Sequence, residues 1–213
     1  MKSKINMNAK REFIIVLLGA LLLVFGTTIL MGTITSGFHL VDDHEFLKWT
    51  YEMERQNIPM MDILTKKVMD DFWWRYEPLY YSARILSCGL FGIDLTAYSV
   101  MKALEIVVSL VFLYYSGRLV GAGRGYAALF SLLSMVGYQS AVWWKLGPQE
   151  SYDIMMFALG FWLMLKWLRT GRRWYAAPSV GAFYLMSINK QPFILLLPLE
   201  RLYVLYEEMT GKK

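Results

Sequence analysis

The chain has 213 residues, of which 56% are hydrophobic and 18% are charged, and its mean hydropathy is +0.36. A typical soluble domain carries about 25% charged residues, so this composition excludes an ordinary soluble domain and predicts an integral membrane protein. The net charge is only +5, and we expect no nucleic-acid partner. Cys88 is the one cysteine of the sequence, which excludes an intramolecular disulfide.

The first apolar segment predicts a membrane-spanning helix. Residues 13–41 contain no Asp, Glu, Lys or Arg, and about 20 helical residues cross a hydrocarbon core of about 30 Å. A cleaved signal peptide is the alternative, but its apolar core would have only about 7–15 residues. We therefore expect an uncleaved first span at 13–35.

A large polar segment, residues 36–94, follows the first span. Between Thr35 and Asp94 the sequence has ten acidic and six basic residues. Two amphipathic interfacial helices are expected at roughly 43–56 and 60–74, separated by the sequence "NIP". A third helix is expected at 78–92, which is too short for a comfortable span and suits a helix lying at the membrane interface.

Five further spans are predicted, at 95–116, 125–144, 150–168, 174–189 and 192–206. The fold class is therefore all-α: a polytopic membrane helical bundle of about six transmembrane spans in one domain, residues 1–213, with interfacial helices in the first outward loop. Cytoplasmic loops are rich in Lys and Arg. If the helix at 78–92 does not cross the membrane, all clustered basic segments fall on the cytoplasmic side, together with both termini. The basic residues of these segments are Lys2, Lys4, Lys10, Arg11, Arg118, Arg124, Lys166, Arg169, Arg172, Arg173, Lys212 and Lys213.

Four short motifs fall on the opposite, outward side of this arrangement. They are "VDDHEF" at 41–46, "RYEPLYYSARILSCGLFGID" at 75–94, "LGPQES" at 146–151 and "SINKQPF" at 187–193. In this order the motifs resemble the membrane glycosyltransferases of the C fold (GT-C superfamily). Such enzymes usually have many more spans, so the chain looks like an N-terminal part or a compact relative. Gln191 stands where the family has the acidic member of a Lys-Glu pair.

The resemblance implies transfer of a sugar from a polyprenyl-phosphate donor, with inversion, to a glycan, lipid or protein acceptor at the outer face of a bacterial plasma membrane. Asp42 or Asp43 would be the general base. Cationic side chains would stabilise the charge on the leaving phosphate. The residues that the resemblance assigns to substrate are Glu45, Arg75, Tyr76, Glu150 and Lys190. Asp42, Asp43 and Glu45 could also hold a divalent cation, Mg²⁺ or Mn²⁺, through oxygen ligands.

Several of these residues have a purely structural alternative. Asp42 and Glu45 have the spacing of a capping box at a helix start, and Arg75 could snorkel to lipid headgroups. His39 and His44 share no helix face, which argues against a metal site that uses both. The aromatic residues Trp73 and Trp74 fit an interface belt or a platform for sugar stacking.

Charged residues also occur inside the predicted spans. Lys102 and Glu105 are three residues apart in the second span, and buried charges of this kind usually face protein and pair with each other. Asp153 lies near the outward end of the fourth span, where it would line the same cavity as the outward loops.

Two other functions remain open at this stage. A flippase for lipid-linked sugars would also need intramembrane charge, although polar residues should then line a path through the membrane. A non-catalytic or truncated relative of the glycosyltransferases, acting as a scaffold partner, is the second alternative. Transfer from a labelled polyprenyl-phosphate sugar separates all three.

Overall fold

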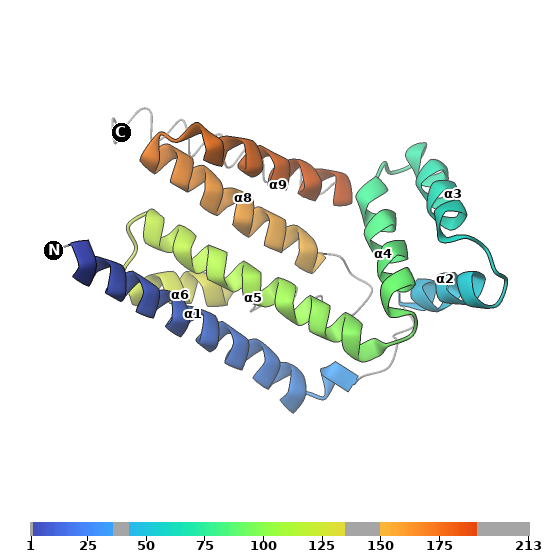
Figure 1. Ribbon diagram of the computed structural model, residues 1–213, viewed down its shortest axis with the longest axis horizontal. Helices are drawn as coiled ribbons and strands as arrows, with labels where there is room; N and C mark the ends of the chain where they lie inside the picture. The colour runs from blue at the N-terminus through green and yellow to red at the C-terminus, as the bar shows by residue number, and fades with distance from the viewer. Residues whose placement is uncertain (1, 36–42, 135–149, 191–213) are drawn as a thin grey trace.

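The described residues of the computed structural model, 2–35, 43–134 and 150–190, form an all-helical fold without a β-strand. The longer helices lie side by side as a bundle, and short helices gather at one end of it (Figure 1). The α-helices of these residues are α1 (Lys2–Leu30), α2 (His44–Glu54), α3 (Met60–Phe72), α4 (Pro78–Phe91), α5 (Leu95–Leu119), α6 (Arg124–Leu133), α8 (Glu150–Thr170) and α9 (Ala176–Asn189). Short 3₁₀ turns, η1 (Thr33–Thr35) and η3 (Arg173–Tyr175), precede the polar segment and α9.

Helix α1 is longer at its N-terminal end than the predicted span at 13–35 and ends earlier. It stops at Leu30 because Gly32 has φ of +69°, a conformation that glycine adopts without steric cost. The chain continues as η1, whose Thr33 carbonyl oxygen lies 3.5 Å from the hydroxyl of Ser99 in α5. The end of α1 is thereby fixed next to the start of α5.

Helix α5 is the centre of the bundle. Its apolar residues Ala103, Ile106, Val107 and Leu110 pack against Ala20 and Val24 of α1 in one buried cluster. The ring of Phe112 packs against that of Trp162 of α8 in a tilted arrangement, with ring centroids 5.2 Å apart. On the side of α6, Ser131 donates a hydrogen bond of 2.7 Å to the Leu110 carbonyl oxygen.

The helix directions follow from these contacts. Glu12 of α1 contacts Arg118 near the end of α5, so α1 and α5 are antiparallel, whereas Ser151 at the start of α8 contacts Glu105 in the first half of α5, so α5 and α8 are parallel. As a result, the N-terminal end of α1, the α5–α6 turn and the α8–α9 turn lie at one end of the bundle, opposite the short helices (Figure 1).

The three short helices α2, α3 and α4 form a small packed unit at that opposite end (Figure 1). Phe46 and Trp49 of α2, Ile63 of α3 and Ile85 of α4 share a buried cluster with Tyr98 of α5. Asp94 caps α5 by accepting hydrogen bonds from the Thr96 and Ala97 amides at 2.9 and 3.2 Å. These contacts join the polar segment to the bundle at the start of α5.

The expected helices agree with the observed ones over the described residues. Helices α2, α3 and α4 are present where interfacial helices are predicted, and α5, α8 and α9 are helices at the positions of the predicted spans 95–116, 150–168 and 174–189. The span at 125–144 is described only as far as α6 and the turn after it, and the span at 192–206 lies outside the described residues. Within the part of the chain that is described, Ala9–Leu30 and Leu95–Leu119 are the two helical stretches long and apolar enough to cross a membrane.

The α8–α9 contact yields a first prediction. A Cβ atom at Gly160 would lie 2.6–2.9 Å from ring atoms of the buried Phe183, and the Gly160 carbonyl oxygen accepts a hydrogen bond from Ser179 at 2.8 Å. We expect Gly160→Ala to destabilise the fold by about 1–3 kcal/mol through overpacking, measured by thermal unfolding in detergent.

Gly181→Ala in α9 is the matched control for that experiment. No heavy atom lies within 4 Å of a Cβ at Gly181, so this change should be neutral or stabilising by up to about 1 kcal/mol through helix propensity. Equal stability of the two variants would contradict the close packing of α8 on α9.

Candidate functional site

Charged and polar side chains gather where α2 and α4 meet the ends of α5, α8 and α9. Asp43, Arg84, Lys102, Asp153 and Asn189 are each no more than 5% exposed. Lys102 lies within electrostatic range of Glu105, Glu150, Asp43 and Arg84, residues from four parts of the chain. We call all these residues, together with three neighbours, the polar cluster. Its members are Asp43, Glu45, Arg84, Lys102, Glu105, Glu150, Ser151, Asp153, Asn189 and Lys190.

Asp43 stands directly before α2 and is fully buried. It is the residue at the N-cap position, yet its side chain makes no capping hydrogen bond to α2. The capping-box interpretation, in which Asp42 caps and Glu45 reciprocates, therefore does not describe the observed start of α2. Asp42 itself lies outside the described residues.

Arg84 of α4 is fully buried in an aromatic cage. Its guanidinium carbon lies 4.7 Å from the Phe46 ring centroid, 5.5 Å from that of Trp49 and 4.9 Å from that of Tyr80. The Tyr80 hydroxyl accepts a hydrogen bond from Arg84, and Glu45 Oε2 lies 3.0 Å from Arg84 Nη1. A buried guanidinium needs both a counter-charge and hydrogen-bond acceptors, and the cage supplies them from α2 and α4.

Two titratable groups beside the cage are held neutral by burial. Burial raises the pKa of the Cys88 thiol, which lies 3.8 Å from the Phe46 carbonyl oxygen. Burial, assisted by the carboxylates of Asp71 and Glu45, also raises the pKa of the Tyr81 hydroxyl. Both side chains are therefore neutral at neutral pH.

The α5 part of the cluster is formed by Lys102 and Glu105, one helical turn apart. Glu105 Oε2 accepts a hydrogen bond of 2.6 Å from Ser151 at the start of α8. The expected interaction between Lys102 and Glu105 is present as electrostatic attraction, but both residues also interact with groups outside α5. The pair thus connects the polar cluster to α8.

Helices α8 and α9 add two further interactions. Lys190, directly after α9, forms an ion pair with Glu150 at the start of α8. Asn189 Nδ2 donates a hydrogen bond of 2.9 Å to Asp153 Oδ1, and both side chains are fully buried. Among the described residues, no hydrogen-bond donor contacts Glu150 Oε2, Asp153 Oδ2 or Asn189 Oδ1, although all three oxygens are buried.

The predicted site residues fall into two groups. Four of them belong to the polar cluster. Asp43 and Glu150 interact electrostatically with Lys102. Glu45 forms an ion pair with Arg84, and Lys190 forms one with Glu150. Arg75 and Tyr76 instead lie exposed on the α3–α4 turn, with their amides donating to the Asp71 carbonyl oxygen at 3.0 and 3.1 Å.

The neighbouring tryptophans belong to the same turn and are largely exposed. Trp73 and Trp74 are 81% and 88% exposed. This exposure is compatible with an interface belt and with a stacking platform alike, and it keeps both rings out of the polar cluster.

Sequence reasoning missed three members of the polar cluster. Arg84 lies within the helix expected at 78–92 and has no role in the predicted site, and neither Ser151 nor Asn189 is among the predicted site residues. Two signals were available. Arg84 is the only charged residue between Glu77 and Asp94, and Ser151 and Asn189 are next to Glu150 and Lys190, which were identified.

The proposed metal ligands do not form a complete site within the described residues. No group of three or more His, Cys, Asp and Glu side chains in that part of the chain is arranged to hold a metal ion. Glu45, one of the three expected ligands, is paired with Arg84.

No protein-family model, curated protein or solved structure matches the chain. The class that the described residues define is therefore a structural one: an all-helical bundle with a buried polar cluster at one end.

The buried Arg84 yields a second prediction. Glu45→Gln keeps the shape of the side chain and removes the charge opposite a fully buried guanidinium. We expect a loss of about 1.5–3 kcal/mol in unfolding free energy, the range for a hydrogen bond to a charged group. Denaturant or thermal unfolding in detergent measures it.

Glu52→Gln on the same helix is the control. Glu52 faces Lys48 at 4.0 Å in an (i, i+4) pair whose lysine is largely exposed, and such surface pairs contribute little. A loss in Glu52→Gln as large as that in Glu45→Gln would contradict a special role for the pair with Arg84.

Proposed function

We propose that the chain is a membrane glycosyltransferase that moves a sugar from a polyprenyl-phosphate lipid to a glycan, lipid or protein acceptor. The observation that carries the proposal is the full burial of Asp43 in a cluster that also holds Lys102 and is completed by the Glu150–Lys190 pair. A general base and cations are the groups that such a transfer needs. The resemblance of the four outward motifs to GT-C enzymes supports the same reaction.

In the proposed membrane arrangement about six helices cross the bilayer. They are α1, α5, α6 with the residues that follow it, α8, α9 and the segment 192–206. Helices α2, α3 and α4 then lie at the outer face of a bacterial plasma membrane, and both termini are cytoplasmic. Two features support this orientation: the basic residues of α1, the α5–α6 turn and the α8–α9 turn share one end of the bundle, and the polar cluster occupies the other.

The proposed reaction is a single displacement with inversion. The Asp43 carboxylate accepts the proton of the acceptor hydroxyl as its oxygen forms a bond to the anomeric carbon of the sugar. The bond between that carbon and the phosphate oxygen breaks, and the electron pair leaves with the polyprenyl phosphate. General-base assistance of this kind contributes roughly 10²–10⁴-fold in rate.

Cationic side chains receive the charge of the leaving phosphate in this proposal. Lys190 is partly exposed beside the buried cluster, and Arg75 is exposed on the α3–α4 turn with a guanidinium fork suited to two phosphate oxygens. The buried oxygens of Glu150, Asp153 and Asn189 are acceptors to which sugar hydroxyls can donate. Tyr76 next to Arg75 is proposed to contact the donor.

The orientation is tested by cysteine labelling. In a Cys88→Ala background, Gln56→Cys in the turn after α2 and Thr170→Cys at the end of α8 place thiols at exposed positions at opposite ends of the bundle. A membrane-impermeant maleimide added to intact cells should label residue 56 and should label residue 170 only after the membrane is opened. Labelling of both from outside would overturn the topology and with it the outward site.

The reaction is tested with a labelled polyprenyl-phosphate sugar in membranes that contain the protein. We expect Asp43→Asn to lower transfer, measured per amount of folded protein in the membrane, by about 10²-fold or more. Asp62→Asn, an exposed position in the first turn of α3, is the control and should keep full activity. Asp42→Asn, at the other candidate base, is measured alongside.

Other outcomes decide between the functions. Full activity in both Asn variants, or a loss that only follows a loss of folded protein, would overturn the base assignment. Movement of the donor lipid between leaflets without transfer would identify a flippase. A wild-type protein without either activity would leave the scaffold function.

A further inference from the structure

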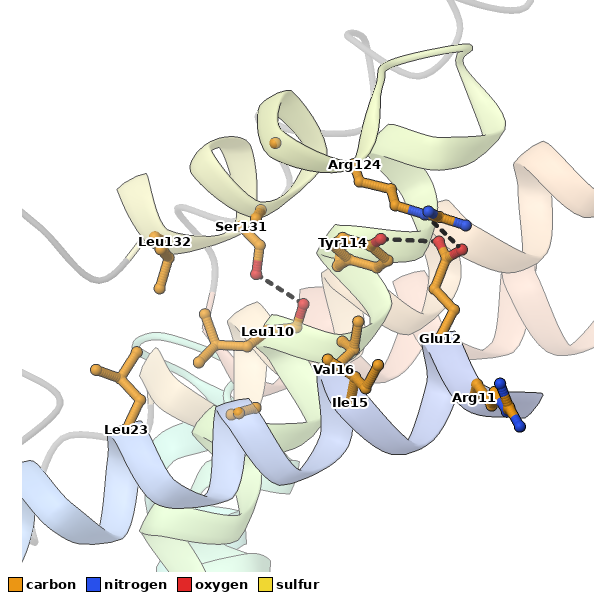
Figure 2. Close-up of a pocket in the computed structure, with 14 residues that line it drawn as sticks. Arg11, Glu12, Ile15, Val16, Leu23, Leu110, Tyr114, Arg124, Ser131 and Leu132 are labelled. Atoms are coloured by element: carbon orange, nitrogen blue, oxygen red, sulfur yellow. Dashed lines mark hydrogen bonds and ion pairs between the residues drawn. The ribbon is translucent and has the colours of Figure 1, made fainter. Parts of the chain in front are cut away.

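A cavity of about 800 Å³ lies between α1, α5 and α6, away from the polar cluster. Its α1 wall is formed by Ile15, Val16, Gly19 and Leu23, and its α6 wall by Ala128 and Leu132. Figure 2 shows Glu12, Tyr114 and Arg124 together at one end of this cavity, and Leu23 and Leu132 facing each other at the other end. The cavity thus has one charged end and one apolar end.

The charged end has more positive than negative groups. Glu12 accepts a hydrogen bond from Tyr114 at 2.8 Å and pairs with Arg118 Nε at 3.0 Å and Arg124 Nε at 3.1 Å. Arg11 also lines the cavity, and its side chain is exposed. Three arginines against one carboxylate leave this end with an excess of two positive charges.

The size of the apolar part fits one lipid chain. From Glu12 to Leu23 the α1 wall extends over 11 residues, which at 1.5 Å per residue is about 16 Å. Half of a hydrocarbon core of about 30 Å is similar in length. A lipid whose headgroup meets the arginines would therefore place an acyl chain along the whole apolar wall within one leaflet.

From this charge and shape we infer that the α1–α5–α6 cavity is a binding site for an anionic phospholipid. The phosphate contacts Arg11 and Arg124, and one acyl chain lies between Gly19 and Ala128. Basic pockets between membrane helices are suited to anionic headgroups. Arg11 near the start of α1 and Arg124 at the α5–α6 turn lie on elements at the opposite end of the bundle from α2 and α4 (Figure 1), so the lipid headgroup is far from the polar cluster and the lipid is distinct from the proposed sugar donor.

The inference is tested by native mass spectrometry of the purified full chain. The probes are phosphatidylglycerol and phosphatidylcholine with identical acyl chains, added in equal amounts. Wild-type protein should retain phosphatidylglycerol in preference to phosphatidylcholine. Arg11→Gln and Arg124→Gln should each lower that preference roughly fivefold, as expected for one basic group at an anionic lipid.

Glycines of α1 provide a matched pair of variants for the apolar part. Gly19 lines the cavity and Gly26 does not, and a Cβ at either position meets no atom within 4 Å. Gly19→Leu should fill the cavity and abolish retention of the lipid, whereas Gly26→Leu should leave it unchanged. Ala128→Leu fills the same space from α6, and thermal unfolding verifies that each variant is folded.

Each outcome has a definite meaning. Equal retention of both lipids by the wild type, or unchanged retention in folded Gly19→Leu and Ala128→Leu proteins, would overturn the site. Absence of any retained lipid would mean that the cavity is closed by the chain itself, which also overturns it. No sugar transfer is measured, so the result stands apart from that of the proposed enzyme.

Discussion

The burial of one guanidinium determines how the short helices are held. Arg84 cannot enter a protein interior without compensation, because moving an unpaired charge out of water costs several kcal/mol. Glu45 and Tyr80 supply that compensation, and the rings of Phe46 and Trp49 close around the group. Lys102 of α5 is within electrostatic range of Arg84, so the position of the cage also affects the electrostatic environment of Lys102. The polar cluster depends on this arrangement.

Much of the helical framework follows from sequence because its signals are local. Apolar runs between charged residues predict α5 and α8, "NIP" separates α2 from α3, and Pro78 stands at the first position of α4. The boundaries are less predictable. Helix α1 extends through a basic N-terminal region that no hydropathy argument assigns to it, and its end depends on the backbone conformation of Gly32.

The candidate site was only partly predictable because it depends on contacts between distant residues. A charge next to an apolar run, such as Asp43 or Lys190, stands out by position alone. The role of Arg84 depends on which face of α4 meets α2, and hydropathy gives no such information for a helix of 14 residues. Asn189 and Asp153 are 36 residues apart, and the sequence around each residue does not indicate its contact with the other. Packing geometry, rather than composition, therefore joins these groups.

The ion pairs of Glu12 have a consequence for how the protein is assembled during synthesis. Arg118 and Arg124 lie 106 and 112 residues after Glu12 in the chain. The first helix therefore leaves the ribosome before its partners exist, and its carboxylate cannot pair with both arginines until the α5–α6 turn is made. The ion pairs of Glu12 therefore form only after most of α5 has been made, and a chain that stops before Arg124 has the pair with Arg118 but lacks the second one.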